Sequence, residues 1–344
     1  DVIMLLAQGH VVYFGNVNDC LKYFEYPLDS DMNPADYIVE EIQTNEVKYI
    51  EKWKDNIYKN DIDSLTKTLD INIPKRAPIP SQIHALLNRE LKLLLRDPRV
   101  TKIRIIQTIL FALVVGLLYL DVGDDSHSKR NKWGAVFFTL INSGMTGLFT
   151  MVTTFPEVRV LFEKERNNNM YSTIVYLLVI IFKALIENIL FSLLYVIIVY
   201  FMIGLDQNFW GYYLVVTINM AAMTAVGICA GCFAANATEA MQYINLPMII
   251  FLLFSNFFVS ADQIPSVLSW IKYINTWYYG LNALAIAEFE GIVWSPNDTG
   301  NMYLDELDVA HGGNKWTQNV VLILVCYIGY ISIACAVLAL RNGM

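Results

Sequence analysis

Charged residues are scarce in this chain. Asp, Glu, Lys and Arg make up 16% of the 344 residues, whereas apolar residues make up 56% and the mean hydropathy is +0.42. A soluble protein usually carries about 25% charged residues. The net charge is −8, and basic residues gather only beside apolar stretches, which is not a nucleic-acid-binding signature. The composition therefore excludes an ordinary soluble domain and gives no support to a nucleic-acid partner.

Histidine and cysteine are also scarce. The four histidines are dispersed, so metal ligation and nucleophilic catalysis have little support. The five cysteines fall near the N-terminus or within apolar stretches, so we expect no extracellular disulfide. Cys229 and Cys232 have the C-x-x-C spacing of redox and metal sites, but on an apolar helix we interpret them as small packing residues.

Long apolar stretches dominate the rest of the chain. A backbone in hydrocarbon must satisfy its own hydrogen bonds, so stretches of about 20 apolar residues predict membrane-spanning helices. A further stretch at 264–289 is interrupted by Pro265, Lys272 and Gly280. We therefore predict an all-α polytopic membrane protein with six transmembrane helices, at 103–120, 133–155, 172–203, 209–234, 241–259 and 317–340.

The distribution of charge predicts the topology. Residues 89–104 hold six Lys or Arg, which the positive-inside rule places in the cytoplasm. With six crossings, the loop at 156–171 and both termini are also cytoplasmic. The segment 262–316, with two cations against seven acids, then faces outward, so 264–289 is predicted to form re-entrant helices on the outer face. The sequon that begins at Asn297 predicts glycosylation there.

The region before the first span carries local structure signals. Residues 2–6 and 10–14 alternate as the strands of a hairpin, and Asn33 followed by Pro34 predicts a helix start. The basic amphipathic pattern at 81–100 predicts a helix on the cytoplasmic membrane surface or, alternatively, a soluble helix packed on a domain. We therefore divide the chain into a short α+β segment at 1–40, a linker at 41–80, an amphipathic connecting helix at 81–100 and a transmembrane domain at 101–344, with the re-entrant helices and outer loop at 260–316.

Short motifs follow one another along the whole chain: Leu5 to Gly15, Tyr23-Phe24, Asn33 to Tyr37, Arg89-Glu90, Arg96-Asp97-Pro98, Phe162 to Arg166, Tyr171-Ser172, Phe254 to Val259, Ile264-Pro265, Trp270 to Tyr273, Tyr279 and Glu288-Phe289. In this order they resemble the G subfamily (white and multidrug-exporter type) of ATP-binding-cassette transporters. The resemblance identifies the chain as a C-terminal fragment with the membrane domain, preceded by the end of a nucleotide-binding domain.

The sequence lacks the ATP-binding motifs of the family that it resembles. A phosphate-binding loop of the G-x-x-x-x-G-K-[ST] type is absent, so this sequence cannot bind or hydrolyse ATP by the family mechanism. No cofactor is expected in the fragment itself. ATP and magnesium are expected in a nucleotide-binding domain upstream on the natural chain, which the start at Asp1 favours, or on a partner. By resemblance the chain functions in the plasma membrane, surrounded by lipid, as a homo- or heterodimer with a second half-transporter.

The resemblance predicts a substrate cavity between the second and fifth spans of two subunits. An amphipathic ligand needs apolar walls with a few polar groups. Packing or contact with lipid is the alternative role of the same side chains. The predicted cavity residues are Phe138, Asn142 and Met145, spaced to share one helical face, with Ile249, Leu252 and Leu253 opposite them, and the predicted outer plug is Phe257 and Phe258.

Charged residues near the inner face have two predicted roles. Lys183 and Glu187 are four residues apart within the third span and can pair on one face, either as a proton relay or, as the resemblance favours, as a structural pair. The loop at 157–166 is either a solvated turn or, by resemblance, the segment that couples the nucleotide domain to the spans. The predicted coupling residues are Arg96, Glu157, Glu163, Glu165 and Arg166, with Glu165 and Arg166 able to pair with the connecting helix.

These features predict an exporter of lipophilic or amphipathic molecules driven by ATP hydrolysis elsewhere. A channel or receptor that needs no ATPase is the alternative. An intramembrane enzyme would require a polar catalytic pair within the spans, and only Lys183 and Glu187 approach that requirement.

Overall fold

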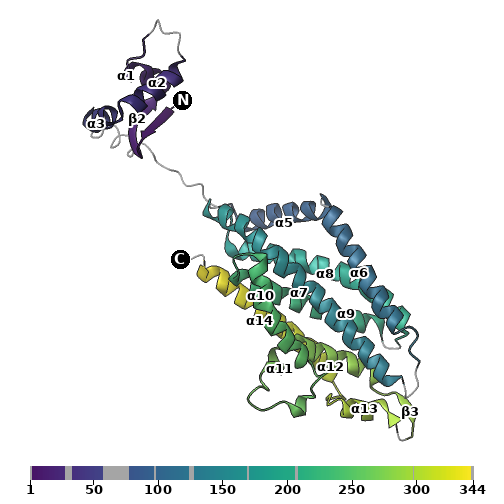
Figure 1. The fold of residues 1–344 in the computed structure, drawn as a ribbon. Coiled ribbons are helices and arrows are strands. Elements are labelled where there is room, and N and C mark those ends of the chain that lie inside the picture. The colour runs from purple at the N-terminus through teal and green to yellow at the C-terminus, as the bar shows by residue number, and fades with distance from the viewer. Residues whose placement is uncertain are drawn as a thin grey trace. The chain divides into compact units, whose positions relative to one another are not determined.

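The computed structural model describes residues 2–27, 33–56, 77–96, 98–123, 128–168, 170–205, 208–296 and 298–341 (Figure 1). The chain separates into two units, Asp1–Pro74 and Lys75–Met344.

The small unit begins with the predicted hairpin. Strands β1 (Val2–Ala7) and β2 (His10–Asn16) pair antiparallel, and the turn between them places Gln8 and Gly9 at positive φ. Helix α1 (Val17–Tyr23) follows, and α2 (Pro34–Thr44) begins where Asn33 Oδ1 accepts a hydrogen bond from the Ala35 amide at 2.9 Å. The predicted hairpin and helix start are therefore confirmed.

Aromatic residues form the core of the small unit. Phe24, Tyr49 and Trp53 are buried, and the rings of Phe24 and Tyr49 lie 4.8 Å apart. Tyr49 and Trp53 belong to α3 (Glu46–Asn56), which packs against β2. The unit thus extends beyond residue 40, where we predicted a linker to begin, because aromatic residues of α3 complete its core. Residues 57–76 of that predicted linker lie outside the described residues.

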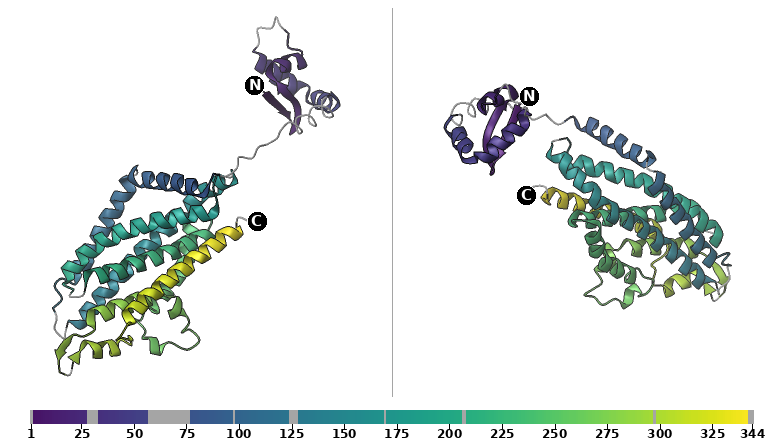
Figure 2. Two further views of the ribbon diagram at one scale, coloured as in Figure 1. Left: turned by 180° about the vertical axis from the view of Figure 1, so that it is seen from behind. Right: turned by 45° about the horizontal axis from the view of Figure 1, so that its top comes forward.

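The large unit is a helical bundle with a few short elements at one end (Figures 1 and 2). Its elements, in chain order, are α5 (Ile79–Arg96), α6 (Pro98–Leu118), α7 (Lys129–Asn167), α8 (Thr173–Ile203), α9 (Phe209–Phe233), α10 (Ala237–Leu253), η1 (Ala261–Gln263), α11 (Ile271–Ile274), α12 (Thr276–Phe289), β3 (Val293–Ser295), β4 (Asp298–Thr299), α13 (Gly300–Glu306) and α14 (Lys315–Arg341). Helix α5 and the C-terminal end of α14 lie at one end of the bundle, whereas α12, α13 and β3 lie at the other.

Five of these helices are long and apolar enough to cross a membrane: α6, α7, α8, α9 and α14. The chain is therefore an integral, multi-pass membrane protein. The predicted fifth span is shorter than expected, because α10 has 17 residues and ends at Leu253 instead of residue 259. At a rise of about 1.5 Å per residue it is about 25 Å long, less than the hydrocarbon thickness of about 30 Å. Asn256, at a φ of 72°, lies in the non-helical stretch that follows.

The second span is longer than expected. Helix α7 has 39 residues and continues through Pro156 to Asn167, so most of the predicted loop at 156–171 is helix.

Glycines allow α7 to approach α9 closely. A Cβ atom on Gly147 would lie 2.6 Å from the backbone oxygen of Met220, and one on Gly227 would lie 2.6 Å from that of Leu148. Such small residues are typical of tight helix contacts in membranes.

The predicted re-entrant stretch at 264–289 contains the helices α11 and α12. Helix α12 is buried along most of its length and packs against α7, α9 and α14. Trp277 of α12 is fully buried and lies against Gly144 of α7, where a larger residue would collide with the indole ring. Helix α12 is therefore part of the bundle core, while its depth relative to a bilayer stays a prediction.

Candidate functional site

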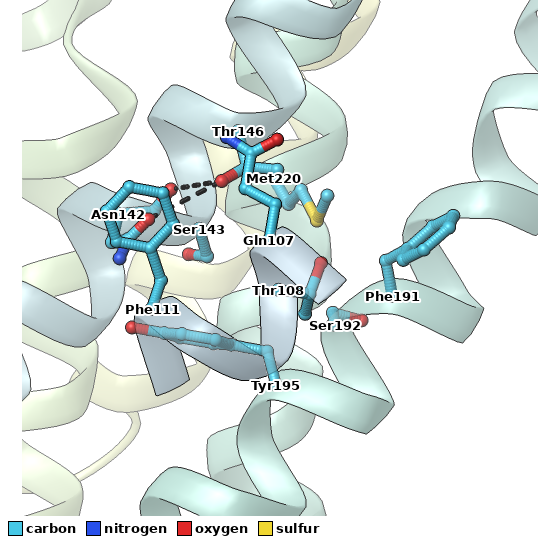
Figure 3. Close-up of a pocket in the computed structure, with 10 residues that line it drawn as sticks. All are labelled: Gln107, Thr108, Phe111, Asn142, Ser143, Thr146, Phe191, Ser192, Tyr195 and Met220. Atoms are coloured by element: carbon cyan, nitrogen blue, oxygen red, sulfur yellow. Dashed lines mark hydrogen bonds between the residues drawn. The ribbon is translucent and has the colours of Figure 1, made fainter. Parts of the chain in front are cut away.

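Asn142 faces a small pocket within the bundle. Its side-chain oxygen lies 3.5 Å from the hydroxyl of Thr146, which also donates to the Asn142 backbone oxygen at 2.9 Å. The pocket volume is about 20 Å³, which admits about one water molecule and not a drug-sized ligand. Figure 3 shows the lining residues, which come from α6, α7, α8 and α9: Gln107, Thr108, Phe111, Asn142, Ser143, Thr146, Phe191, Ser192, Tyr195 and Met220.

The other predicted cavity residues lie on two helices that pack together, α7 and α10. Met145 and Leu252 are half-buried against the main core. Phe138, Ile249 and Leu253 are 45%, 50% and 43% exposed, so they project from the surface of this single chain. The structure therefore brings the two predicted sets onto neighbouring helices, and their role as a substrate cavity stays a prediction.

The predicted plug residues follow α10 and contact α7. The Phe257 ring stacks on that of Phe137, with centroids 3.7 Å apart and planes 16° apart, and Trp133 lies 5.8 Å away. Phe258 meets Phe137 edge-on at 5.5 Å and is 57% exposed. Sequence reasoning missed Phe137 and Trp133, although their spacing of four residues places them on one helical face.

Charged side chains connect α5 to the α7 and α8 ends. Nη1 of Arg89 donates to both carboxylate oxygens of Glu165 at 2.8 Å, and the Tyr171 hydroxyl donates to the same carboxylate. Glu90 accepts from Lys183 at 3.1 Å and lies 3.3 Å from Arg89. We call these five residues the α5 charge network. It confirms that Glu165 pairs with the connecting helix.

The pKa values of two members of the network, Arg89 and Tyr171, are raised. Burial lowers the pKa of Arg89, but the hydrogen bond and charge of Glu165 outweigh it and raise that pKa above its ordinary value. Burial, and next the hydrogen bond to Glu165, raise the pKa of Tyr171. Both groups therefore keep their protons at neutral pH, and the three side chains remain bonded.

The prediction that Lys183 pairs with Glu187 is wrong. Lys183 pairs with Glu90 of α5, whereas Glu187 pairs with Arg104 of α6. The Arg104 guanidinium also lies over the Phe191 ring at 4.2 Å. Each of the two charges of α8 therefore binds a different neighbouring helix. Spacing along α8 could not show this, because the partners lie 93 and 83 residues away in sequence.

The remaining predicted coupling residues differ in their surroundings. Glu163 is half-buried and lies 3.2 Å from Arg159, and Arg166 is half-buried as well. Arg96 and Glu157 are exposed. Arg159, to which we gave no role, is 1% exposed and donates to three backbone oxygens at the end of α9, those of Gly231, Cys232 and Ala234, at 2.7 to 3.1 Å.

A second buried ion pair lies at the opposite end of the bundle. Lys132 of α7 and Glu288 of α12 are 3.4 Å apart, and their side chains are 3% and 0% exposed. Glu288, at the end of the predicted re-entrant stretch, is therefore buried within the bundle. Nearby, Lys129 pairs with Asp298 at 3.0 Å, and the predicted glycosylation residue Asn297 lies outside the described residues.

The cysteines of the C-x-x-C pair lie between two helices. Cys229 and Cys232 of α9 donate to backbone oxygens of Tyr330 and Ala334 on α14, at 2.9 and 3.9 Å. These contacts agree with their interpretation as packing residues.

Comparison with known proteins decides the family. The sequence profile of the ABC-2 type transporter family matches residues 81–289, which extend from the first turn of α5 to the end of α12. This chain belongs to the ABC-2 type transporter family. The match covers the α5 charge network and both predicted faces of the substrate cavity, so these residues belong to the family's membrane domain.

Curated relatives confirm the resemblance to the G subfamily. The chain is 26% identical to ABC transporter G family member 2 of Dictyostelium discoideum, over 87% of this chain and 25% of that protein. It is 27% identical to Protein white of Drosophila melanogaster, over 85% and 46%. It is 25% identical to the ATP-binding protein/permease wht-1 of Caenorhabditis elegans, over 84% and 48%. The chain thus spans a quarter to a half of the length of these relatives.

Proposed function

We propose that this chain is the membrane domain of a half-transporter that pairs with a second half-transporter and exports lipophilic or amphipathic molecules. The energy comes from ATP and magnesium in a nucleotide-binding domain that this sequence does not contain. Both termini are cytoplasmic, the protein resides in the plasma membrane, and the outer loop is glycosylated at Asn297. Family membership supports the transport role, and the name of one relative, the ATP-binding protein/permease wht-1, supports the energy source.

One observation supports the proposal most strongly. Glu165, which binds α5, and Asn142, which belongs to the predicted cavity, both lie on helix α7, which continues through Pro156 between them. A displacement of α5 by a nucleotide-binding domain would move the end of α7 through the Arg89 and Glu165 pair. Because a helix transmits such movement along its axis, the face that carries Phe138 and Asn142 would move with it.

The proposal predicts separate effects for two kinds of substitution. Glu165→Gln should leave basal ATP hydrolysis of the reconstituted full-length protein in place and abolish its stimulation by lipophilic substrates. Glu306→Gln, at an exposed acid of α13 at the other end of the bundle, is the control and should leave stimulation unchanged. Transport of lipophilic dyes that persists without ATP would instead indicate a channel.

Substitutions in the predicted cavity test the substrate path. Asn142→Ala and Phe257→Ala should change which dyes stimulate hydrolysis or are transported. Unchanged transport of every dye by both variants would contradict the assignment of the cavity and the plug.

A further inference from the structure

A second cavity lies beside the bundle, between α5, α6, α7 and α8. Its volume is about 480 Å³, within the range of sites that hold small molecules. Apolar side chains from all four helices line it, among them Leu93, Ile105, Met151 and Leu190. It shares only Phe191 with the small Asn142 pocket and none of the predicted substrate-cavity residues. Its apolar walls suit a hydrocarbon chain.

The polar part of this cavity is formed by ion-paired side chains. Arg104, Lys183 and Glu187 line it, two cations against one acid. Glu187 is 7% exposed and is bound by one terminal nitrogen of Arg104. Lys183 is held by Glu90, which does not line the cavity.

Arg104 retains an unused donor. Its side chain is 13% exposed, and its Nε is buried without a hydrogen-bond partner among the described residues. A buried charged donor without an acceptor is costly, and such groups are usually satisfied in native proteins. Arg104 lines the cavity, so a rotation of its guanidinium would bring Nε to an acceptor oxygen of a ligand there.

We propose that this cavity binds a phospholipid of the leaflet that surrounds the α5 end of the bundle. A phosphate oxygen accepts a hydrogen bond from Nε of Arg104, and an acyl chain lies along the apolar walls. Arg104 lies three residues after Thr101, where the apolar window of α6 begins, and this suits the depth of a lipid head group. A purely apolar ligand would leave Nε unsatisfied, and a free anion would leave the apolar walls without a partner.

The first test compares ligands on the unaltered full-length protein by native mass spectrometry without ATP. We expect phosphatidylglycerol to bind at least about tenfold more tightly than diacylglycerol with the same acyl chains, since a hydrogen bond to a charged group is worth that ratio or more. We also expect that excess inorganic phosphate will not displace it. Equal binding of diacylglycerol would overturn the role of the phosphate, and displacement by inorganic phosphate would overturn that of the chain.

The second test uses variants that remain charge-balanced. Arg104→Gln with Glu187→Gln removes the donor without leaving a buried charge and should weaken phosphatidylglycerol binding about tenfold. Lys129→Gln with Asp298→Asn neutralises an ion pair at the other end of the bundle and should leave binding unchanged. Unchanged binding in the first double variant would overturn the proposed head-group contact.

A third variant tests the cavity itself. Thr154 lines it and is exposed, so Thr154→Phe should fill it and abolish lipid binding while the protein stays folded. Val160→Phe, at a 46% exposed position of the same helix outside the cavity, is the matched control. Retained lipid binding in a folded Thr154→Phe variant would overturn the location. Because the binding is measured without ATP, its failure would leave the proposed transport function untouched.

Discussion

The pair of Arg89 and Glu165 should contribute measurable stability. Both oxygens of Glu165 accept from Arg89 Nη1 at 2.8 Å, and the two side chains are 31% and 19% exposed. Exposed ion pairs contribute about 0.2–1 kcal/mol, whereas breaking a buried pair costs about 3–5 kcal/mol. The intermediate exposure of this two-bonded pair therefore predicts a coupling energy of about 1–2 kcal/mol.

A double-mutant cycle measures this coupling. For a unit of this size about 1 kcal/mol corresponds to about 2 °C in melting temperature, so Arg89→Gln and Glu165→Gln should each lower it by about 3 °C. The double variant should also lose about 3 °C, because the second substitution removes an interaction that is already broken. These values come from heating the purified protein to a series of temperatures and measuring by size-exclusion chromatography how much folded protein remains at each. Additive losses in the double variant would refute the pairing.

Three further substitutions test other contacts. Gly147→Ala should destabilise the protein by about 1–3 kcal/mol, because its Cβ would lie 2.6 Å from a backbone oxygen of α9, whereas Gly329→Ala, in open space, should have no such effect in the same melting assay. Arg159→Gln should cost about 3 kcal/mol by leaving buried carbonyls of α9 without their donor, and an unchanged melting temperature would contradict it. The folded state raises the pKa of Tyr171 above its ordinary value of 10.0, so the unfolded chain loses that proton first. The free energy of unfolding should therefore fall as pH rises above 10.0. Tyr171→Phe should reduce this fall, and an identical dependence of stability on pH in the variant would contradict the prediction.

Local signals predicted much of the fold. Five of the six predicted spans coincide with long helices, because runs of apolar residues define such helices whatever surrounds them. The cap at Asn33 also depends only on neighbouring residues. The end of α10 was not predictable, because residues 254–259 are as apolar as the helix before them. The tertiary contacts of Phe257 with α7 accompany the departure from helical structure there.

Side-chain partners were less predictable than helices. Pairing Lys183 with Glu187 satisfied the only rule that spacing offers, yet each found a partner on another helix. The pairing of Glu165 with the connecting helix was anticipated because the resemblance brought two segments together that are 76 residues apart. Arg159 resembled a surface charge in sequence, and only the end of α9 beside it gives it acceptors.

The central claim is that the chain crosses the membrane six times, which requires the short helix α10 to span it. An epitope tag inserted at Asn297 of the full-length protein tests this claim directly. The six-crossing arrangement predicts that antibody labels this tag on intact cells, whereas a tag after Met344 is labelled only once the membrane is permeabilised. If the tag at Asn297 is also reached only after permeabilisation, α10 does not cross and the proposed topology is wrong.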